Sequence, residues 1–470
     1  RPTEHPMANI FRPYDDTPLN FSCHCGQHSS QSECDRASLV LDERFANVSA
    51  SSQTEHATTD MIEAVAVKAL FPHEPTRRAF LKAVGKGTAL AAIASVLPLS
   101  ALQEAAALDR LNPEKKSVDI GFLPILCSTP LIMAHPLGYY EEQGITANLH
   151  KRAGWALVRD QMMNRELDAT HFLAPMPLAI TLGLGSAKQD MKVAAIQNTN
   201  GQALVMALKH ANNRDPKNWK GMTFAIPFEH SIHNYLLRYF LAEHGLDPDR
   251  DVKLRLTTPP DMIANLKAGN IDGFFGPEPF NQRAVWDKAG YIHTLSRDIW
   301  LGHPCCSFGT SQAFINDNPQ SFLAIYRAII KANVMANEPS IRKDLSTLLA
   351  PANYLNQPEL VLRQSIMGRF ADGVGNVQDV PDRMGFDVMP WHSVAIWMLT
   401  QMKRWGYLKE NINYQNIAEQ VFLLTDAKRQ MTAMGYALRD EPAIKVMGKT
   451  FDPTRPDDYL KSFTIGAKGN

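Results

Sequence analysis

The sequence predicts an α/β protein made of two hinged lobes, each a largely parallel sheet with helices on its faces. Three observations predict this fold. Short apolar runs alternate with amphipathic segments from about residue 117, the alternation restarts near Gly221, and helical segments dominate from Pro319 onward. A repeated strand–helix–strand order gives parallel neighbouring strands joined by crossover helices. Ligands of such sheets bind at the carboxyl ends of the strands.

The first lobe is expected to begin with an apolar strand over 118–124. Thr129 and Pro130 open a helix that runs to Tyr140, because proline is favoured at the first helical position, and Gly144 follows its end. The next elements expected in this lobe are strands over 145–152, 167–174 and 192–196 and helices over 156–166 and 175–184.

The second lobe is expected to begin with a strand over 222–228 and a helix over 233–245 with an apolar stripe. The later elements expected are strands over 252–258 and 271–275 and helices over 262–268, 279–289, 322–336, 394–405 and 417–434. The expected boundaries are therefore a first lobe over 108–215, a second lobe over 216–300, and a return to the first lobe with C-terminal helices over 301–470. Two lobes joined by crossovers describe a hinged binding protein.

An export signal is expected ahead of the lobes. Arg77 and Arg78 precede an apolar run over 89–99, and three alanines at 105–107 offer a small-residue cleavage site. This order is typical of a twin-arginine signal, here over 76–107, which is read by the twin-arginine translocase. The apolar run is shorter than the roughly 20 residues that span a bilayer. The alternative is an arginine pair at the start of an ordinary helix.

Composition limits the classes of partner. The chain has 470 residues with 48 basic and 48 acidic side chains, so no net charge directs it to nucleic acid. Residues 1–75 are polar and are expected to be disordered. The body shows no Ser/His/Asp order, phosphate-binding loop or HExxH motif, and an enzyme is not expected.

Six cysteines fall into two groups. Cys23, Cys25 and Cys34 lie near His28 and are crowded enough to bind a soft metal, although an unstructured reactive segment is an equal interpretation. The body carries Cys127, Cys305 and Cys306, which do not make a disulfide framework for a domain of this size. The interpretation favoured for Cys305 and Cys306 is two small buried side chains in a hinge strand.

Several blocks of the body form a recognisable pattern. They are residues 121–124, 129–131, 173–179, 200–203, 233–239, 277–281 and 397–406. In their order and spacing these blocks resemble the nitrate- and bicarbonate-binding proteins of bacterial ABC importers, over about residues 117 to 435. The resemblance implies a type II periplasmic binding protein whose cleft closes on nitrate or nitrite, without a metal or other cofactor. It also implies permease and ATPase partners, a role in nitrate assimilation, and a periplasmic location with membrane association only through the permease.

The resemblance further implies that Trp155, Gln202, His233 and Lys288 line the anion. Nitrate is flat, carries one negative charge and offers three acceptor oxygens, so its site needs hydrogen-bond donors and a positive charge. Trp155 supplies an indole N–H, Gln202 an amide, and His233 lies where a helix begins. Lys288 supplies the charge, and the turn at Gly201 is expected to add a backbone donor.

Some alternatives stay open at this point. The residues alone do not choose between His230 and His233. Bicarbonate binders of the family carry an acidic residue and calcium at the position of Lys288, so lysine favours nitrate, and Lys288→Glu is expected to abolish binding. One alternative function is a cytosolic nitrate sensor that binds a regulatory partner. Another is an enzyme similar to the thiamin-pyrimidine synthases, whose cysteine-rich loop Cys305 and Cys306 faintly resemble.

Overall fold

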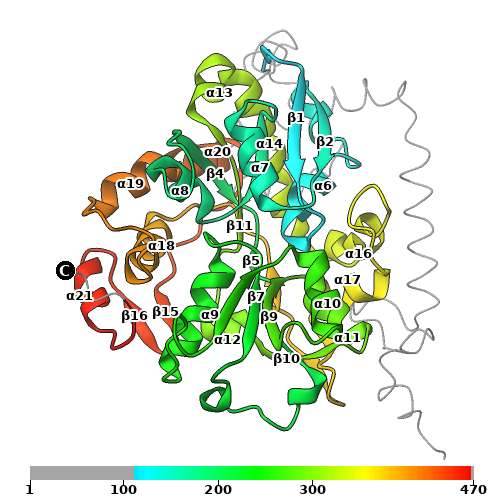
Figure 1. Ribbon diagram of the computed structural model, residues 1–470. Helices are drawn as coiled ribbons and strands as arrows, with labels where there is room; N and C mark the ends of the chain where they lie inside the picture. Colours follow the sequence, from blue (N-terminus) through cyan, green and yellow to red (C-terminus); the bar gives the residue numbers. More distant parts are fainter. Residues whose placement is uncertain (1–110, 467–470) are drawn as a thin grey trace, which may run out of the picture. The chain divides into compact units, whose positions relative to one another are not determined.

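A computed structural model describes residues 111–466 of the chain (Figure 1). The expected twin-arginine signal over 76–107 and the Cys23, Cys25, His28 and Cys34 group lie outside the described residues. Residues 113–430 and 439–466 belong to one compact unit, and residues 431–438 belong to another. The description below concerns the first unit.

The first unit contains two five-stranded sheets. The first sheet has the order β2-β1-β3-β11-β4, and the second has the order β10-β6-β9-β7-β8. The strands of the first sheet are β1 (Ser117–Phe122), β2 (Thr146–Lys151), β3 (Ala169–Leu173), β4 (Met191–Ile196) and β11 (Cys306–Ser311). Those of the second are β6 (Gln202–Ala207), β7 (Thr223–Ile226), β8 (Lys253–Leu256), β9 (Gly273–Pro277) and β10 (Gly290–Leu295). The predicted two-lobed α/β fold is therefore confirmed.

Each sheet holds one strand that runs against its neighbours. β1 pairs in parallel with β2 and β3, whereas β11 is antiparallel to both β3 and β4. In the second sheet β7 pairs in parallel with β8 and β9, whereas β6 is antiparallel to both β9 and β10. β6 and β11 are the first strands after the chain crosses between sheets, at residues 197–201 and 296–305.

The predicted lobe boundary near residue 215 is therefore wrong. The strand Gln202–Ala207 already belongs to the second sheet, so the first crossover precedes Gln202. The physical reason is that this strand and β4 of the first sheet look alike in sequence. All six residues of each strand are buried. An apolar run indicates a buried strand but does not indicate which of two sheets accepts it. The second boundary, expected at residue 300, falls within the crossover that leads to Cys306.

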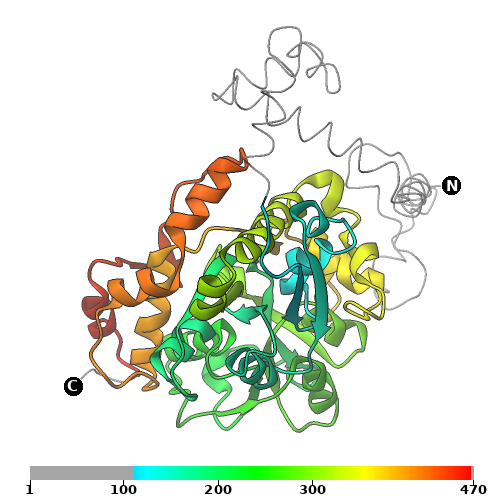
Figure 2. The same cartoon turned by 90° about the horizontal axis from the view of Figure 1, so that it is seen from above.

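Helices pack against both sheets (Figures 1 and 2). The longer helices are α7 (Trp155–Met163), α8 (Met176–Leu182), α9 (Ile232–Glu243), α10 (Pro259–Lys267), α11 (Phe280–Trp286), α14 (Pro319–Ala336), α17 (Glu359–Met367), α18 (His392–Arg404), α19 (Tyr414–Val421) and α20 (Leu424–Ala433). The shorter ones are α6 (Thr129–Met133), α12 (Ser296–Ile299), α13 (Gln312–Asp317), α15 (Pro339–Arg342), α16 (Leu345–Leu349) and α21 (Pro456–Lys461).

Two predicted helices differ from those in the structure. The helix expected to reach Tyr140 ends at Met133, shortly before Pro136, which lacks the N–H that a continuing helix needs. The helix expected over 417–434 is divided into α19 and α20. Leu423 donates its N–H to the carbonyl of Val193 (2.9 Å), so the backbone between the two helices bonds to the edge of the first sheet instead.

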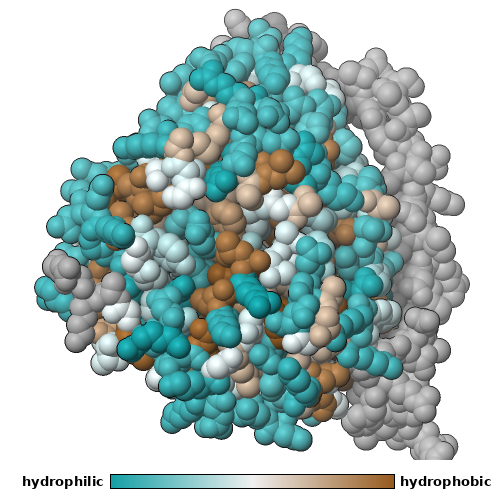
Figure 3. Space-filling model, viewed as in Figure 1, coloured by the Kyte–Doolittle hydropathy of each residue, from teal (hydrophilic) through white to brown (hydrophobic). Residues whose placement is uncertain are grey.

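Short strand pairs complete the unit. They are β5 (Thr199–Asn200) with β14 (Met384–Gly385), β12 (Arg369–Ala371) with β13 (Val377–Asp379), and β15 (Ile444–Val446) with β16 (Lys449–Phe451). On the face shown in Figure 3, hydrophilic side chains dominate and apolar ones form small separate patches. Among residues 111–466, no helix combines the length and the apolar character that crossing a bilayer requires.

Candidate functional site

The two crossover segments lie side by side and are held together by backbone hydrogen bonds. Asn200 donates its N–H to the carbonyl of His303 (2.9 Å), and Cys305 donates to the carbonyl of Asn198 (3.1 Å). The side-chain oxygen of Asn198 also accepts the N–H of Cys306 (3.1 Å). Because each crossover leads directly into a strand of the other sheet, residues at the starts of β6 and β11 meet where the two lobes join.

The first lobe contributes Trp155 and His171. Their rings lie edge to face, with centroids 4.8 Å apart. Nδ1 of His171 accepts the N–H of Leu123 (3.3 Å), and burial lowers the pKa of His171 to about 3. The ring is therefore neutral at pH 7 and carries its proton on Nε2. Both Trp155 Nε1 and His171 Nε2 are buried without a hydrogen-bond partner among the described residues, so two N–H donors remain for a ligand.

The second lobe contributes Gln202 and His233. Gln202 pairs with Pro277 and Leu204 pairs with Phe275, so these four side chains share one face of the second sheet. The ring of His233 lies 6.3 Å from that of Phe275, on the same face. Both amide atoms of Gln202, and Nδ1 of His233, are buried and have no partner within the described part of the chain.

The structure distinguishes His233 from His230. Ser231 caps α9 by accepting the N–H of Asn234 (3.0 Å), which places His233 in the first turn of a 12-residue helix. Nε2 of His233 lies 4.0 Å from Sγ of Cys305, at the start of the first lobe's β11. His230 instead packs edge to face against Tyr407, 5.2 Å away. His233 is therefore the histidine at the crossovers, and the positive end of the helix dipole lies beside it.

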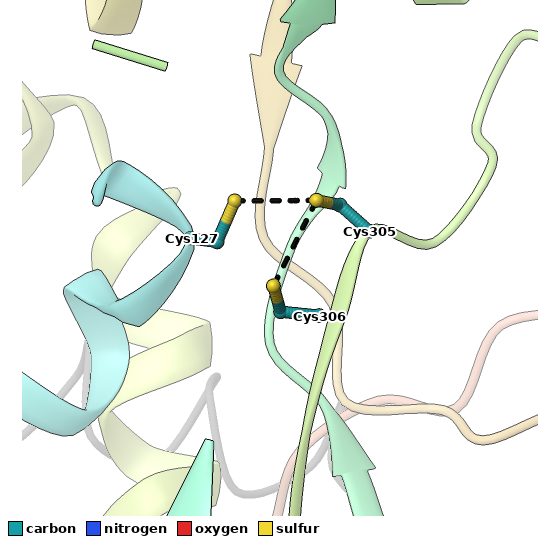
Figure 4. A group of neighbouring side chains, drawn as sticks. All are labelled: Cys127, Cys305 and Cys306. Atoms are coloured by element: carbon teal, nitrogen blue, oxygen red, sulfur yellow. Dashed lines mark hydrogen bonds between the residues drawn. The ribbon is translucent and has the colours of Figure 1, made fainter. Parts of the chain in front are cut away.

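Three cysteines lie in the same place. Sγ of Cys305 is 3.3 Å from Sγ of Cys127 and 3.8 Å from Sγ of Cys306 (Figure 4). Burial raises the pKa of the Cys305 thiol, but the Cys127 and Cys306 S–H groups and His233 outweigh it and hold that pKa well below its usual range. Burial and the neighbouring sulfurs raise the pKa of Cys127 and of Cys306. The three thiols therefore titrate as one interacting group and not independently.

The two lobes touch on several sides of these groups. Leu126 donates its N–H to the carbonyl of Glu278 (2.9 Å). Gly185 of the first lobe lies beside Glu229 of the second, since a Cβ built on Gly185 would lie 2.8 Å from Oε1 of Glu229. The side chains of Trp155, His171, Gln202 and His233 are at most 2% exposed. The structure therefore shows the lobes closed around the donors.

Lys288 is not brought to this place. It is exposed and lies in the turn that follows α11, with a left-handed backbone angle (φ 53°). Trp155, His171, Gln202 and His233 are at most 2% exposed, so an exposed Lys288 does not share their buried surroundings. Its exposure therefore does not support the expectation that its ammonium lies beside the indole and the imidazole.

Gly201 supplies the expected turn but not a free backbone donor. Its φ of 75° is in the left-handed region, which favours glycine, and a Cβ there would lie 3.0 Å from Cγ of Met384. Its N–H is donated to the carbonyl of Arg383 (3.0 Å). The guanidinium of Arg383 is itself paired with the carboxylate of Glu278, so it adds no net charge. Trp155, His171 and Gln202 are therefore the neutral donors of this group.

Lys288→Glu is accordingly expected to change ligand affinity by less than about twofold, because the charge of an exposed side chain is screened by solvent and salt. Calorimetric titration of the variant beside the unmodified chain measures this. Loss of binding in Lys288→Glu would mean that the lysine reaches the ligand in another conformation.

Sequence reasoning missed His171 and Gln197. Both amide atoms of Gln197 are buried and unpartnered within the described residues, and its N–H bonds the carbonyl of Cys306 (2.9 Å). The signal available was a polar side chain inside an otherwise apolar strand. His171 interrupts β3, and Gln197 directly follows the fully buried β4. A buried polar group needs a partner, so such residues are candidates for ligand contact.

Comparison with known proteins identifies relatives of the chain. The model of the NMT1-like family matches residues 111–350. The nitrate/nitrite binding protein NrtA of Nostoc sp. is 30% identical over 383 residues, which cover 75% of this chain and 86% of NrtA. The nitrate import ATP-binding protein NrtC of Synechocystis sp. is 31% identical over 386 residues; the match covers 75% of this chain but only 56% of NrtC. This chain therefore spans little more than half the length of NrtC.

A solved structure shares the fold. The crystal structure of the periplasmic nitrate-binding protein NrtA from Synechocystis superposes with a TM-score of 0.72 and 24% sequence identity. The superposition covers 75% of this chain and all of that one.

Proposed function

Because the chain belongs to the NMT1-like family and has the fold of the periplasmic binding proteins, we propose that it is the solute-binding protein of an ABC importer and that its ligand is nitrate or nitrite. The single observation that carries this proposal is the set of buried, unpartnered donors at the crossovers. Trp155 and His171 come from one lobe, and Gln202 and His233 from the other. A ligand that accepts hydrogen bonds from both lobes stabilises their closed arrangement.

A small planar oxyanion suits these donors. Nitrate has only acceptor atoms, and the indole N–H, the neutral imidazole N–H of His171 and the amide of Gln202 offer donors without competing charge. A buried donor without a partner costs about 1–3 kcal/mol, which a bound anion removes. The first turn of α9 adds a favourable dipole. The positive charge that Lys288 was expected to supply is therefore replaced by neutral groups and a helix terminus.

The proposal extends to location and partners. The two relatives described above are proteins of nitrate transport, one of them an ATP-binding protein, which supports a permease and an ATPase as partners. Export to the periplasm by the twin-arginine route follows from the arginine pair at 77–78. Cell fractionation tests the location. A protein found only in the cytosol would favour the sensor function instead.

Titration of the purified full chain against nitrate, nitrite, bicarbonate with calcium, and an alkylsulfonate tests the ligand. The expected result is saturable binding of nitrate or nitrite at one site per chain. If neither anion binds, the proposed ligand is wrong. Binding of bicarbonate alone would indicate a bicarbonate-binding protein instead. An absorption spectrum of the same sample tests for an enzyme, because a pyridoxal-phosphate Schiff base would absorb in the visible range.

Trp155→Phe is expected to weaken nitrate binding by roughly 10- to 100-fold, because a hydrogen bond to a charged partner contributes about 1.5–3 kcal/mol. Phenylalanine keeps the ring against His171 and removes only the indole N–H. Trp391→Phe is the matched control, since Nε1 of Trp391 is also buried and unpartnered within the described residues, at the start of α18. Equal affinity of both variants in calorimetry would place the ligand elsewhere.

A further inference from the structure

The proposed anion site does not use the three cysteines. Their sulfur atoms all lie within 4.8 Å of one another, and each residue is fully buried. Cys127 lies in the short helix η2 (Leu126–Ser128), while Cys305 and Cys306 lie where the second crossover enters β11. The sulfurs therefore come from segments that are about 180 residues apart in sequence (178 between Cys127 and Cys305) and turn toward one another (Figure 4).

A nitrogen atom stands beside this group. Nε2 of His233 is 4.0 Å from Sγ of Cys305, and Nδ1 of the same ring has no partner among the described residues. Three thiols and one imidazole are the ligand set of a closed Cys₃His site. Calcium and magnesium require oxygen ligands, so this donor set does not suit them.

The separations of the sulfurs agree with a tetrahedral metal centre, and His233 lies at its edge. Zinc holds sulfur at about 2.3 Å and nitrogen at about 2.0–2.1 Å, so tetrahedral ligand atoms are about 3.5–3.8 Å apart. The separations here are 3.3 Å between Cys127 and Cys305, 3.8 Å between Cys305 and Cys306, and 4.0 Å between Cys305 and His233. Shifts of a few tenths of an ångström in the sulfur pairs would seat an ion among the thiols. The imidazole of His233 would move farther, because neither of its nitrogens lies within 4.8 Å of all three sulfurs.

We propose that Cys127, Cys305, Cys306 and His233 form a binding site for a thiophilic cation, Zn²⁺, where the two lobes join. The site ties a segment of the first lobe (Cys127) and the entry to β11 to the first turn of α9 in the second lobe. A bound ion would therefore hold the lobes together without an anion.

Charge makes the two ligands competitors. Three thiolates, one neutral imidazole and Zn²⁺ carry a formal charge of about −1, because each cysteine must lose its proton to bind the metal. That centre repels a monovalent anion bound beside it. Zinc is thus expected to weaken nitrate binding, and nitrate to weaken zinc binding by the same factor.

The test uses the full chain with Cys23, Cys25 and Cys34 changed to serine and His24 and His28 changed to alanine, so that the N-terminal group contributes no thiol or imidazole ligand. The protein is kept reduced, stripped with a chelator and titrated with Zn²⁺ against a chromophoric chelator. One equivalent of zinc is expected, and Co²⁺ in its place should give the absorption of a tetrahedral thiolate complex. Cys127→Ser and Cys306→Ser should each weaken zinc at least about 100-fold, since even indirect partners of metal ligands affect affinity 10- to 100-fold.

Measuring nitrate binding beside zinc uptake distinguishes the zinc site from the proposed nitrate-binding function. Cys127→Ser is expected to lose zinc and to keep nitrate binding and the circular dichroism spectrum of the parent. No zinc uptake by the parent, or uptake unchanged in both serine variants, would overturn the metal site while leaving nitrate binding untouched. Failure of nitrate binding with zinc uptake intact would overturn only the proposed function.

Discussion

Gln202→Glu is expected to abolish anion binding. Gln202 is 1% exposed at the start of β6, and neither of its amide atoms has a partner within the described residues. A carboxylate there replaces an N–H donor by a negative charge of similar shape. Two unit charges about 4 Å apart repel by about 4 kcal/mol at an effective dielectric constant of 20, which corresponds to roughly 1,000-fold in affinity. Isothermal calorimetry with nitrate measures the loss.

The pH dependence of this variant distinguishes charge repulsion from misfolding. Burial raises the pKa of a carboxyl group, so lowering the pH should protonate Glu at position 202 and restore part of the affinity. Gln378→Glu makes the same chemical change on the exposed strand β13 and should leave binding unchanged. Full nitrate affinity in Gln202→Glu at neutral pH would exclude Gln202 from the site.

Glu278→Gln is expected to destabilise the protein more than any other change considered for the crossovers. The carboxylate is fully buried, pairs with the guanidinium of Arg383, and accepts hydrogen bonds from Ser365 Oγ (2.7 Å) and Asn281 Nδ2 (3.2 Å). Removing its charge leaves a buried guanidinium unpaired, which costs about 3–5 kcal/mol. For a chain of this size a melting temperature lower by roughly 6–10 °C is expected, from about 2 °C per kcal/mol.

Two control variants test whether the loss of stability comes from the buried ion pair. Glu359→Gln breaks the exposed pair with Arg363 (2.7 Å), and such pairs contribute at most about 1 kcal/mol, so its melting temperature should barely move. Adding Arg383→Met to Glu278→Gln removes both buried charges and should recover part of the loss. Thermal unfolding followed by circular dichroism compares all of these variants. Equal melting temperatures for Glu278→Gln and Glu359→Gln would show that the buried pair does not matter for stability.

Much of the local structure follows from sequence patterns. The strands expected over 118–124 and 192–196 and the helices expected over 233–245 and 322–336 agree with β1, β4, α9 and α14 within a few residues. These segments have strong periodicity or continuous burial, which short-range pattern detects. Predicted ends were less accurate where a proline or a bond to the sheet edge stopped a helix, as at Met133 and Phe422.

The candidate site was also predicted only in part from the sequence. The resemblance implied Trp155 and His233, and the structure buries both, each with a ring nitrogen that has no partner among the described residues. Lys288, implied in the same way, is instead exposed in the turn after α11. His171 could be marked as a candidate by its polar side chain in a buried strand, but its neighbours depend on the pairing of β3 with β11.

The sequence by itself determined the repeated α/β units, the two-lobed class and most elements, because hydrophobic periodicity is a local property of the chain. Only the tertiary structure decided that Gln202–Ala207 enters the second sheet, that His233 and not His230 meets Cys305, and that Cys127 lies 3.3 Å from a residue 178 positions away. Those outcomes depend on which sheet edge accepts a strand and on how the lobes close. Both are set by pairing and packing between segments far apart in the chain. Short-range sequence patterns therefore do not predict them.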